Sequence, residues 1–180
     1  MSTLKDFYYA EIIRDSGRSF SWWSVLNRMR RSRRCNYLFW FRMAYVLHDS
    51  PSSMKRSIAK SINNWMIKRH NIEIMLGVKI DEGLNVGHNV GIVITCKAII
   101  GKNFLILQNT TIGSDGKSDA PINIGDNVSL GANTCIIGSG LSIGDNVEVG
   151  AMSFINKSIP ADHIYITEKT SYYKLKAKAP

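Results

Sequence analysis

Long hydrophobic runs are missing from this sequence of 180 residues. The longest, residues 36–47, spans about a dozen residues and contains Arg42, so it is too short and too charged to cross a bilayer. The first residues also lack the charged-then-apolar layout of a signal peptide. We therefore expect a cytoplasmic protein.

Cysteine is scarce, and its number is odd. The three cysteines, Cys35, Cys96 and Cys135, show no metal-ligand spacing. We interpret them as reduced thiols in the cytosol. Neither a disulfide framework nor a bound metal is expected.

Acidic residues are few compared with basic ones. The chain holds 23 Lys and Arg but only 14 Asp and Glu, which gives a net charge of +9. Such an excess suggests an anionic partner, which could be nucleic acid, a membrane surface or a phosphorylated small molecule. Nucleic acid is not expected, because no nucleic-acid-binding module is recognisable.

Residues 1–72 are predicted to form a helical region. Apolar residues recur there at helical spacing, and a turn around Pro51 separates two helices. Ser52 or Ser53 is the predicted N-cap of the second helix. Arginines and aromatic residues concentrate in residues 22–42. Either the aromatic side chains pack on the rest of the protein while the arginines stay solvated, or these helices attach to the anionic inner face of a membrane.

From residue 74 the sequence repeats every six residues. Thirteen branched apolar residues fall into groups with a step of six, and glycine directly follows seven of them. This period fits a parallel β-helix, in which each short strand buries one branched residue and then turns. Glycine and asparagine suit the tight corners, and stacked coils stabilise one another. We predict a β-helix over residues 73–159 and a short tail over residues 160–180. The repeat positions are Ile74, Ile80, Val86, Ile94, Ile100, Ile106, Ile112, Ile124, Leu130, Ile136, Ile143, Val149 and Ile155.

These repeats, with "IGDNV" twice and "VGHNV" and "IGKNF" as variants, resemble the hexapeptide-repeat acyltransferases. The resemblance implies a mainly β fold, the left-handed parallel β-helix, assembled as a homotrimer and using acetyl-CoA as acyl donor. Within that superfamily the chain resembles the serine O-acetyltransferase branch, and especially its shorter relatives that acetylate bacterial exopolysaccharides such as colanic acid.

The repeat slips once, between Val86 and Ile94, which are eight residues apart. Extra residues in a tightly wound coil must bulge outward, so His88 is expected to project from the surface. The resemblance implies that His88 is a general base that deprotonates the acceptor hydroxyl, a role that suits a neutral imidazole. It also implies that Glu73, fifteen residues earlier, orients the ring, where similar enzymes carry an aspartate. The alternative is a solvated corner residue, because "VGHNV" is "IGDNV" with one substitution.

One repeat, from Ile112 to Ile124, is twelve residues long, so it carries a loop of six extra residues. The resemblance implies that this loop borders the acetyl and pantetheine end of the cofactor, with Gly113, Ser114 and Asp115 as contacts.

The loop departs from the serine acetyltransferases, which carry an Asp-Arg-His-Pro run there. This chain has "SDAP", with Ala120 and no arginine, and Gly87 replaces an aspartate that precedes their catalytic histidine. A neutral sugar hydroxyl needs neither a carboxylate clamp nor an ammonium partner. We therefore expect a saccharide acceptor.

The resemblance further predicts a cofactor groove between subunits. It is lined by the small residues that follow the glycines and, at its phosphate end, by lysines. These residues are Gly131, Ala132, Gly150, Ala151, Lys157 and Lys169.

The expected function is acetyl-CoA-dependent O-acetylation of a capsular, exopolysaccharide or O-antigen sugar. The enzyme alternatives are a serine O-acetyltransferase and a sugar-nucleotide N-acetyltransferase. A non-catalytic β-helix scaffold is the alternative from another class, and it predicts no binding of acetyl-CoA. A metal enzyme of the γ-class carbonic anhydrase type is set aside, because the coils contain only His88, whereas the other histidines are read as surface or helix-packing residues.

Overall fold

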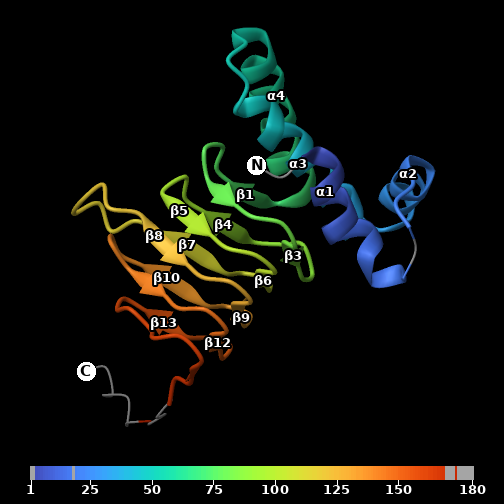
Figure 1. Ribbon diagram of the computed structural model, residues 1–180. Coiled ribbons are helices and arrows are strands. Elements are labelled where there is room, and N and C mark those ends of the chain that lie inside the picture. Colours follow the sequence, from blue (N-terminus) through green and yellow to red (C-terminus); the bar gives the residue numbers. More distant parts are fainter. Residues whose placement is uncertain (1–2, 18, 169–172, 174–180) are drawn as a thin grey trace, which may run out of the picture.

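The structure is a computed structural model that describes residues 3–17, 19–168 and 173. A helical region precedes a parallel β-helix, and the two are joined directly where α4 runs into β1 (Figure 1). No helix in the described part of the chain is both long and apolar enough to cross a membrane. The helical elements are α1 (Leu4–Tyr8), the π-helical turn η1 (Tyr9–Ile13), the 3-10 turn η2 (Arg14–Ser16), α2 (Trp22–Arg31), α3 (Arg33–His48) and α4 (Ser53–His70).

The predicted N-cap of the last helix is confirmed. The Ser52 hydroxyl accepts a hydrogen bond from the Lys55 backbone N–H at 3.5 Å. At the other end Asn71 adopts a left-handed conformation (φ 55°), which ends α4 and turns the chain into the first strand.

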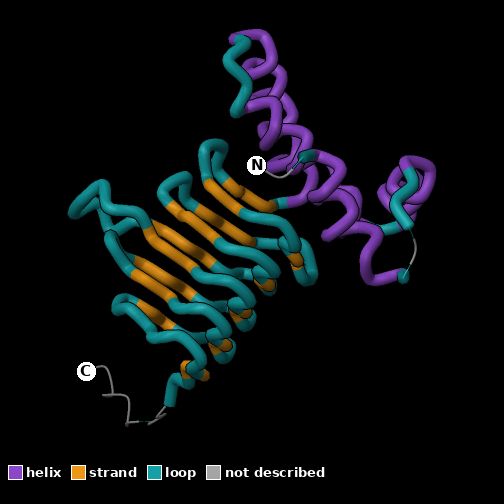
Figure 2. The backbone as a smooth tube through the Cα atoms, in the orientation of Figure 1, coloured by secondary structure: helices purple, strands orange, loops and turns teal. Residues whose placement is uncertain are grey.

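The β-helix has three sheets of parallel strands that wind around one interior (Figure 2). The A sheet consists of β1 (Ile72–Ile74), β4 (Ile92–Ile94), β7 (Thr111–Gly113), β10 (Cys135–Ile137) and β13 (Phe154–Ile155). The B sheet consists of β2 (Lys79–Ile80), β5 (Ala98–Ile100), β8 (Ile122–Ile124) and β11 (Ser142–Ile143). The C sheet consists of β3 (Asn85–Val86), β6 (Leu105–Ile106), β9 (Ser129–Leu130), β12 (Glu148–Val149) and β14 (Ile164–Tyr165).

The strand β14 lies within residues that the sequence assigns to the tail. It pairs with β12 through the partners Glu148–Ile164 and Val149–Tyr165. The C sheet thus continues past residue 159.

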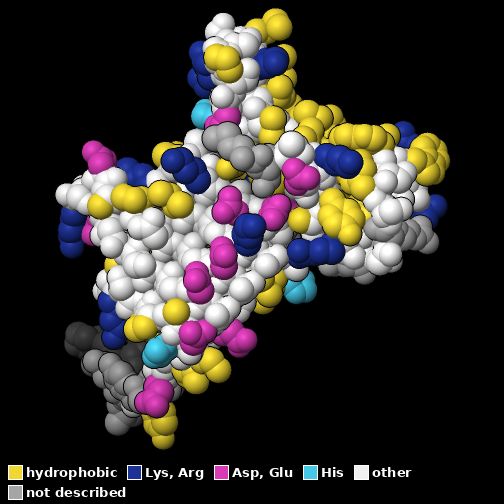
Figure 3. Space-filling view, in the orientation of Figure 1, with side chains coloured by type: hydrophobic (Ala, Val, Ile, Leu, Met, Phe, Trp, Pro, Cys, Tyr) yellow, Lys and Arg dark blue, Asp and Glu magenta, His cyan; other side chains and the backbone are white. Residues whose placement is uncertain are grey.

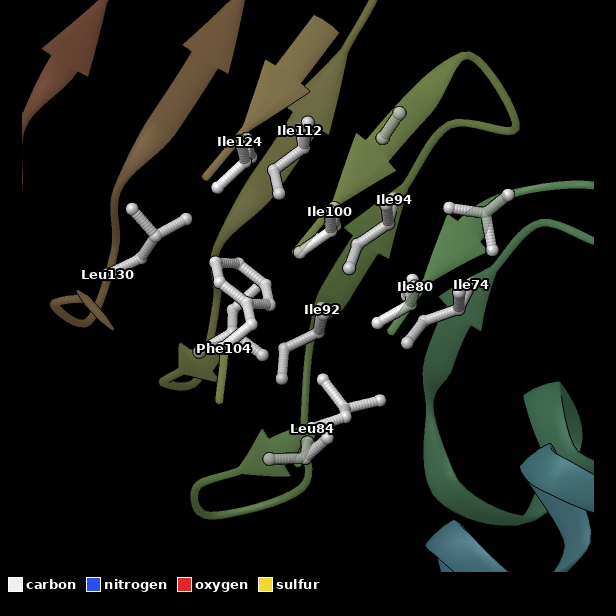
Figure 4. Packing of buried hydrophobic residues seen from close by; sticks show 14 of the residues in the cluster. Ile74, Ile80, Leu84, Ile92, Ile94, Ile100, Phe104, Ile112, Ile124 and Leu130 are labelled. Atoms are coloured by element: carbon white, nitrogen blue, oxygen red, sulfur yellow. The ribbon is translucent and has the colours of Figure 1, made fainter. Parts of the chain in front are cut away.

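The repeat positions form the interior of the β-helix. Ile74, Ile94 and Ile112 are stacked in register along the A sheet, and each is at most 1% exposed. Branched side chains from the three sheets point toward a common axis (Figure 4). Burial of each such side chain contributes about 1.5–3 kcal/mol, so the six-residue period follows from the need to bury one residue per side.

Asparagines at one corner form a ladder between coils. The Asn103 amide donates to Asn127 at 2.9 Å, Asn127 donates to Asn146 at 3.0 Å, and Asn146 donates to Asp162 at 2.7 Å. All four residues have positive φ, between 54° and 60°. A short polar side chain that tolerates this conformation therefore repeats along the sequence.

A buried ion pair fastens the helices to the first coil. Arg42 is fully buried and donates to the Glu11 carboxylate, with a shortest distance of 2.6 Å. Arg42 also donates to the carbonyl oxygens of Ile80 at 2.8 Å and Asp81 at 2.6 Å. Glu11 in turn accepts from the backbone N–H of Leu84 at 3.1 Å. The helical region therefore fixes the segment that leads to His88.

Candidate functional site

The over-long segment forms a tight turn between β3 and β4. His88 and Asn89 are consecutive left-handed residues, with φ 58° and 47°. Gly87 N–H bonds to the Ile106 carbonyl at 2.8 Å, and Gly91 N–H bonds to the Asn71 carbonyl at 2.8 Å. The turn is thus held at both ends, and the extra residues lie between these bonds.

The two extra residues have different surroundings. The His88 side chain is exposed, whereas Asn89 is only 3% exposed. The surface position of His88 agrees with the expectation from the repeat slip. A role for His88 as a general base stays a prediction.

Glu73 lies on the outer face of β1, where it is paired in register with Val93 of β4. It lines a groove of about 290 Å³ with residues of α4, among them Lys60 and Asn64. The bond from Gly91 to Asn71 brings the His88 turn beside the start of β1, two residues before Glu73. In the described residues no hydrogen bond joins Glu73 to His88, so the orienting role of Glu73 stays a prediction.

Most of the predicted small residues share an edge with His88. Val86, Ile106, Leu130 and Val149 are aligned along the C sheet. The residues that directly follow them therefore stack at the edge where the C sheet turns into the A sheet. We call this the His88 edge. It carries Gly87, His88, Asn89, Leu107, Gln108, Gly131, Ala132, Gly150 and Ala151.

Packing between coils gives a structural reason for one of these glycines. A Cβ atom on Gly131 would lie 2.5 Å from the Ala151 backbone nitrogen. At Gly150 the nearest atom is the Tyr165 carbonyl oxygen, at 3.3 Å. Gly131 is therefore required by the stacking of the coils, whether or not a ligand lies beside it.

Two amide side chains on the His88 edge have buried polar atoms without a partner. Both amide atoms of Asn89 and the Oε1 atom of Gln108 form no hydrogen bond with the described residues. Buried polar groups are normally satisfied, so these atoms are candidate ligand contacts. The sequence does not single out Asn89, because asparagine is also the ordinary residue at a coil corner. The signal in the sequence is that Asn89 lies in the segment where the six-residue repeat is interrupted.

The loop after β7 is anchored to the neighbouring coils. The Asp115 carboxylate accepts from the Ser139 hydroxyl at 2.6 Å and from the Lys117 backbone N–H at 3.1 Å. The Ser139 bond, followed by the Lys117 bond, lowers the pKa of Asp115. Ser114 lies 3.3 Å from the same Ser139 hydroxyl. These hydrogen bonds fix the conformation of the loop, and Asp115 accepts two of them.

This loop lies on a different edge from His88. It joins β7 of the A sheet to β8 of the B sheet, so Gly113, Ser114 and Asp115 lie at the edge between those sheets. Lys157 is exposed and follows β13, so it lies at the same edge as the loop. Lys169 lies outside the described residues. The predicted site residues therefore form two groups that flank the A sheet.

Solved structures that resemble the chain identify its fold. No protein-family model matches the chain. In fold, the chain matches serine acetyltransferase isoform 3 from Entamoeba histolytica, crystallised with cysteine, with a TM-score of 0.75 and 24% identity over 96% of this chain and 61% of that chain. A Brucella abortus serine acetyltransferase in complex with coenzyme A gives a TM-score of 0.66 with 24% identity, over 73% and 52%. The predicted fold, a hexapeptide-repeat left-handed β-helix with helices at its start, is confirmed.

In sequence, too, the chain resembles serine acetyltransferases. The chain is 36% identical over 117 residues to the mitochondrial serine acetyltransferase 3 of Arabidopsis thaliana, which is 64% of this chain and 30% of that protein. The chain thus matches less than half of that relative's length. The similarity is serine acetyltransferase-like, and it does not support the predicted exopolysaccharide branch.

Proposed function

We propose that the chain is an acetyl-CoA-dependent O-acetyltransferase, with His88 as general base and L-serine as acceptor. The observation that carries this proposal is the exposed histidine on a rigid turn, at an edge of small residues and unpartnered amides. The proteins that resemble the chain are called serine acetyltransferases, and one of them was solved with coenzyme A. These names favour serine over the saccharide that the residues of the loop predict.

In the proposed reaction the neutral His88 imidazole takes the proton of the acceptor hydroxyl. The oxygen forms a bond to the acetyl carbonyl carbon, and the bond from that carbon to sulfur breaks. The imidazolium then returns the proton to the leaving thiolate, so the enzyme ends as it began. Positioned general-base catalysis contributes about a hundred- to ten-thousand-fold. The turn bonds at Gly87 and Gly91 would hold the ring where it is needed.

The His88 edge has features that suit a thin ligand. Ala132 is half-buried and Ala151 is exposed, and each presents only a methyl group, while the Gln108 Oε1 atom has no hydrogen-bond partner among the described residues. The donor would lie along this edge, with its thioester near His88. Asn89 would contact the reacting end of either substrate.

A homotrimer would complete this site. The loop and Lys157 are separated from the His88 edge by the A sheet, whose strands of two or three residues span about 7–10 Å. The outer face of that sheet exposes Val93 and Phe154, at 38% and 55%. We propose that the loop edge of one copy meets the His88 edge of the next, which would bury these side chains.

A saccharide hydroxyl is the second candidate acceptor. Its support is the departure of the loop from the resembled pattern, with Asp119 and Ala120 where an arginine and a histidine are expected, and Gly87 in place of an aspartate. In addition, the Asp119 carboxylate is paired with Lys97 at 2.8 Å. This ion pair leaves neither of the two side chains to hold the carboxylate of serine.

Thiol release from acetyl-CoA tests the function and the acceptor together. The purified protein is given L-serine, free sugars, sugar nucleotides and bacterial glycans in parallel. The His88→Ala variant is expected to lower kcat about a hundred- to ten-thousand-fold with any active acceptor, while the Kd for acetyl-CoA, measured by calorimetry, is nearly kept. His163→Ala is the control, because His163 is also exposed but lies at the far end of the β-helix.

Two outcomes would overturn the proposal. Turnover of His88→Ala within about threefold of wild type would exclude general-base catalysis by His88. Failure to bind acetyl-CoA at millimolar concentration would favour the non-catalytic scaffold. Activity with a sugar and none with serine would select the second acceptor.

A further inference from the structure

The charge of the protein is divided between its two regions. Residues 1–72 hold fourteen basic and four acidic residues, whereas residues 73–180 hold nine basic and ten acidic ones. The net charges are therefore +10 and −1. Acidic side chains form a band along the β-helix on the face shown in Figure 3. The proposed transfer site makes no use of the positive charge on the helices.

Part of this charge surrounds a pocket at the start of α3. The pocket has a volume of about 320 Å³, and none of its lining residues is acidic. Between residues 19 and 72 the only acidic residue is Asp49, which lies beyond the opposite end of α3, about 24 Å away along the helix. The lining residues are Met29, Arg30, Arg31, Ser32, Arg33, Asn36, Trp65, Arg69 and His70.

The first turn of α3 faces this pocket. The Ser32 hydroxyl caps the Cys35 N–H at 3.3 Å, and the start of an α-helix carries a positive partial charge from its unpaired N–H groups. Helix starts of this kind bind phosphate and sulfate groups. A helix start alone does not define a site, but here a second feature points to a ligand.

That second feature is His70. This residue is among those that line the pocket and is only 3% exposed, yet neither of its ring nitrogens has a hydrogen-bond partner among the described residues. The ring is packed edge-on against Tyr37 and Trp65, with centroid distances of 5.4 and 6.2 Å. Burial, and then the charges of Arg33 and Arg69, lower the pKa of His70. An anion in the pocket would offset those charges and give the ring a partner.

The arginines also have a structural use, because α2 and α4 both end at this pocket. Arg33 donates to the His70 carbonyl at 3.4 Å, and arginines stabilise helix C-termini. Two helix ends supply about one negative charge in total, and the start of α3 cancels half of it. Arg30, Arg31, Arg33 and Arg69 bring four positive charges. The pocket therefore retains a large positive excess.

We propose that this pocket is a binding site for a phosphoryl group, held by the first turn of α3, the surrounding arginines and the His70 ring. Arginine binds tetrahedral oxyanions through paired N–H groups, and the pocket has room for a phosphate with a small substituent. Trp65, which is 45% exposed, offers a flat wall for that substituent. The phosphoryl group would come from a soluble phosphate ester or from a lipid headgroup, which share this chemistry.

Inorganic phosphate is the first probe, titrated against chloride at equal ionic strength. The NMR signal of His70, identified by its absence in His70→Gln, is expected to shift with saturation at millimolar phosphate. The double variant Arg30→Gln, Arg31→Gln is expected to weaken binding about tenfold. The charge-matched control Lys55→Gln, Lys79→Gln removes two exposed lysines outside the pocket and is expected to change the Kd less than about twofold.

These measurements distinguish specific binding of phosphate in the pocket from nonspecific electrostatic attraction to a basic protein. Absence of a His70 shift in the wild type, or equal weakening by the two double variants, would overturn the proposal. Flotation with phosphatidylglycerol and phosphatidylcholine vesicles then identifies the source. Binding to the anionic vesicles that free phosphate reverses indicates a lipid headgroup, and phosphate binding without vesicle binding indicates a soluble ester. These readouts need no acetyl transfer, so they are independent of the proposed function.

Discussion

Replacing Arg42 by methionine tests the ion pair that joins the helices to the β-helix. Removal of one partner from a buried pair costs about 3–5 kcal/mol. The change also takes a donor from the Ile80 carbonyl at 2.8 Å and the Asp81 carbonyl at 2.6 Å. A buried group without a partner costs about 1–3 kcal/mol, and Asp81 is exposed, so water replaces its lost bond. We expect a loss of about 4–8 kcal/mol in unfolding free energy.

Urea denaturation followed by circular dichroism measures this loss directly. The double variant Glu11→Leu, Arg42→Met removes both charges and is expected to recover part of the loss, because no uncompensated charge remains, although the Ile80 carbonyl and the Leu84 N–H stay without their partners. Arg56→Met is the control, since Arg56 is an exposed arginine that donates, within the described residues, to just the Ser50 and Pro51 carbonyls. A loss below about 1 kcal/mol for Arg42→Met, or a double variant no more stable than the single one, would refute the reasoning.

Three further predictions concern single positions. Asn89→Gly keeps the left-handed turn but deletes the unpartnered amide. The unfolding free energy is expected to stay within about 0.5 kcal/mol of wild type, while the KM for one of the two substrates rises about tenfold in the thiol-release assay. Unchanged KM values for both substrates would show that Asn89 contacts neither substrate. Gly131→Ala is expected to cost about 1–3 kcal/mol of unfolding free energy, because its Cβ would lie 2.5 Å from backbone. Gly150→Ala, with 3.3 Å available, is expected to cost less, and equal costs would contradict the packing argument. Because the pKa of His70 is lowered on folding, the unfolded chain binds more protons, so denaturation midpoints are expected to fall as pH drops below about 6.5. His70→Gln should flatten that decline, and an identical slope would refute the assignment.

The β-helix could be predicted because each coil repeats the same local requirement. One branched residue per side must be buried, and one corner residue must accept a positive φ, so isoleucine and asparagine recur at fixed places. The exposed position of His88 could be predicted from the same repeat, because the two extra residues between Val86 and Ile94 cannot be accommodated in the interior of the β-helix. The edge shared by His88, Ala132 and Ala151 also follows from position within the repeat.

The contacts between helices could not be read from the sequence in the same way. Glu11 and Arg42 are 31 residues apart, and each resembles an exposed residue of an amphipathic helix. Their pairing depends on how η1 and α3 cross above the first coil. The pocket around His70 likewise needs the ends of α2 and α4 and the start of α3 to meet at one point. Helical periodicity predicts which face is apolar, but not which helix ends converge.

The division of charge constrains how the two proposed sites would recognise anions. Residues 73–159 hold five basic and eight acidic residues, a net charge of −3. An anionic acyl donor is therefore not attracted to the β-helix by its overall field, and at physiological salt a charge acts over only about 8 Å. Binding at the His88 edge must come from short-range contacts with backbone, methyl and amide groups. The pocket at α3 has the opposite character, because several guanidinium groups converge there and none of the described residues that line it is acidic. The first site would select by shape and the second by charge, so each can be altered without the other.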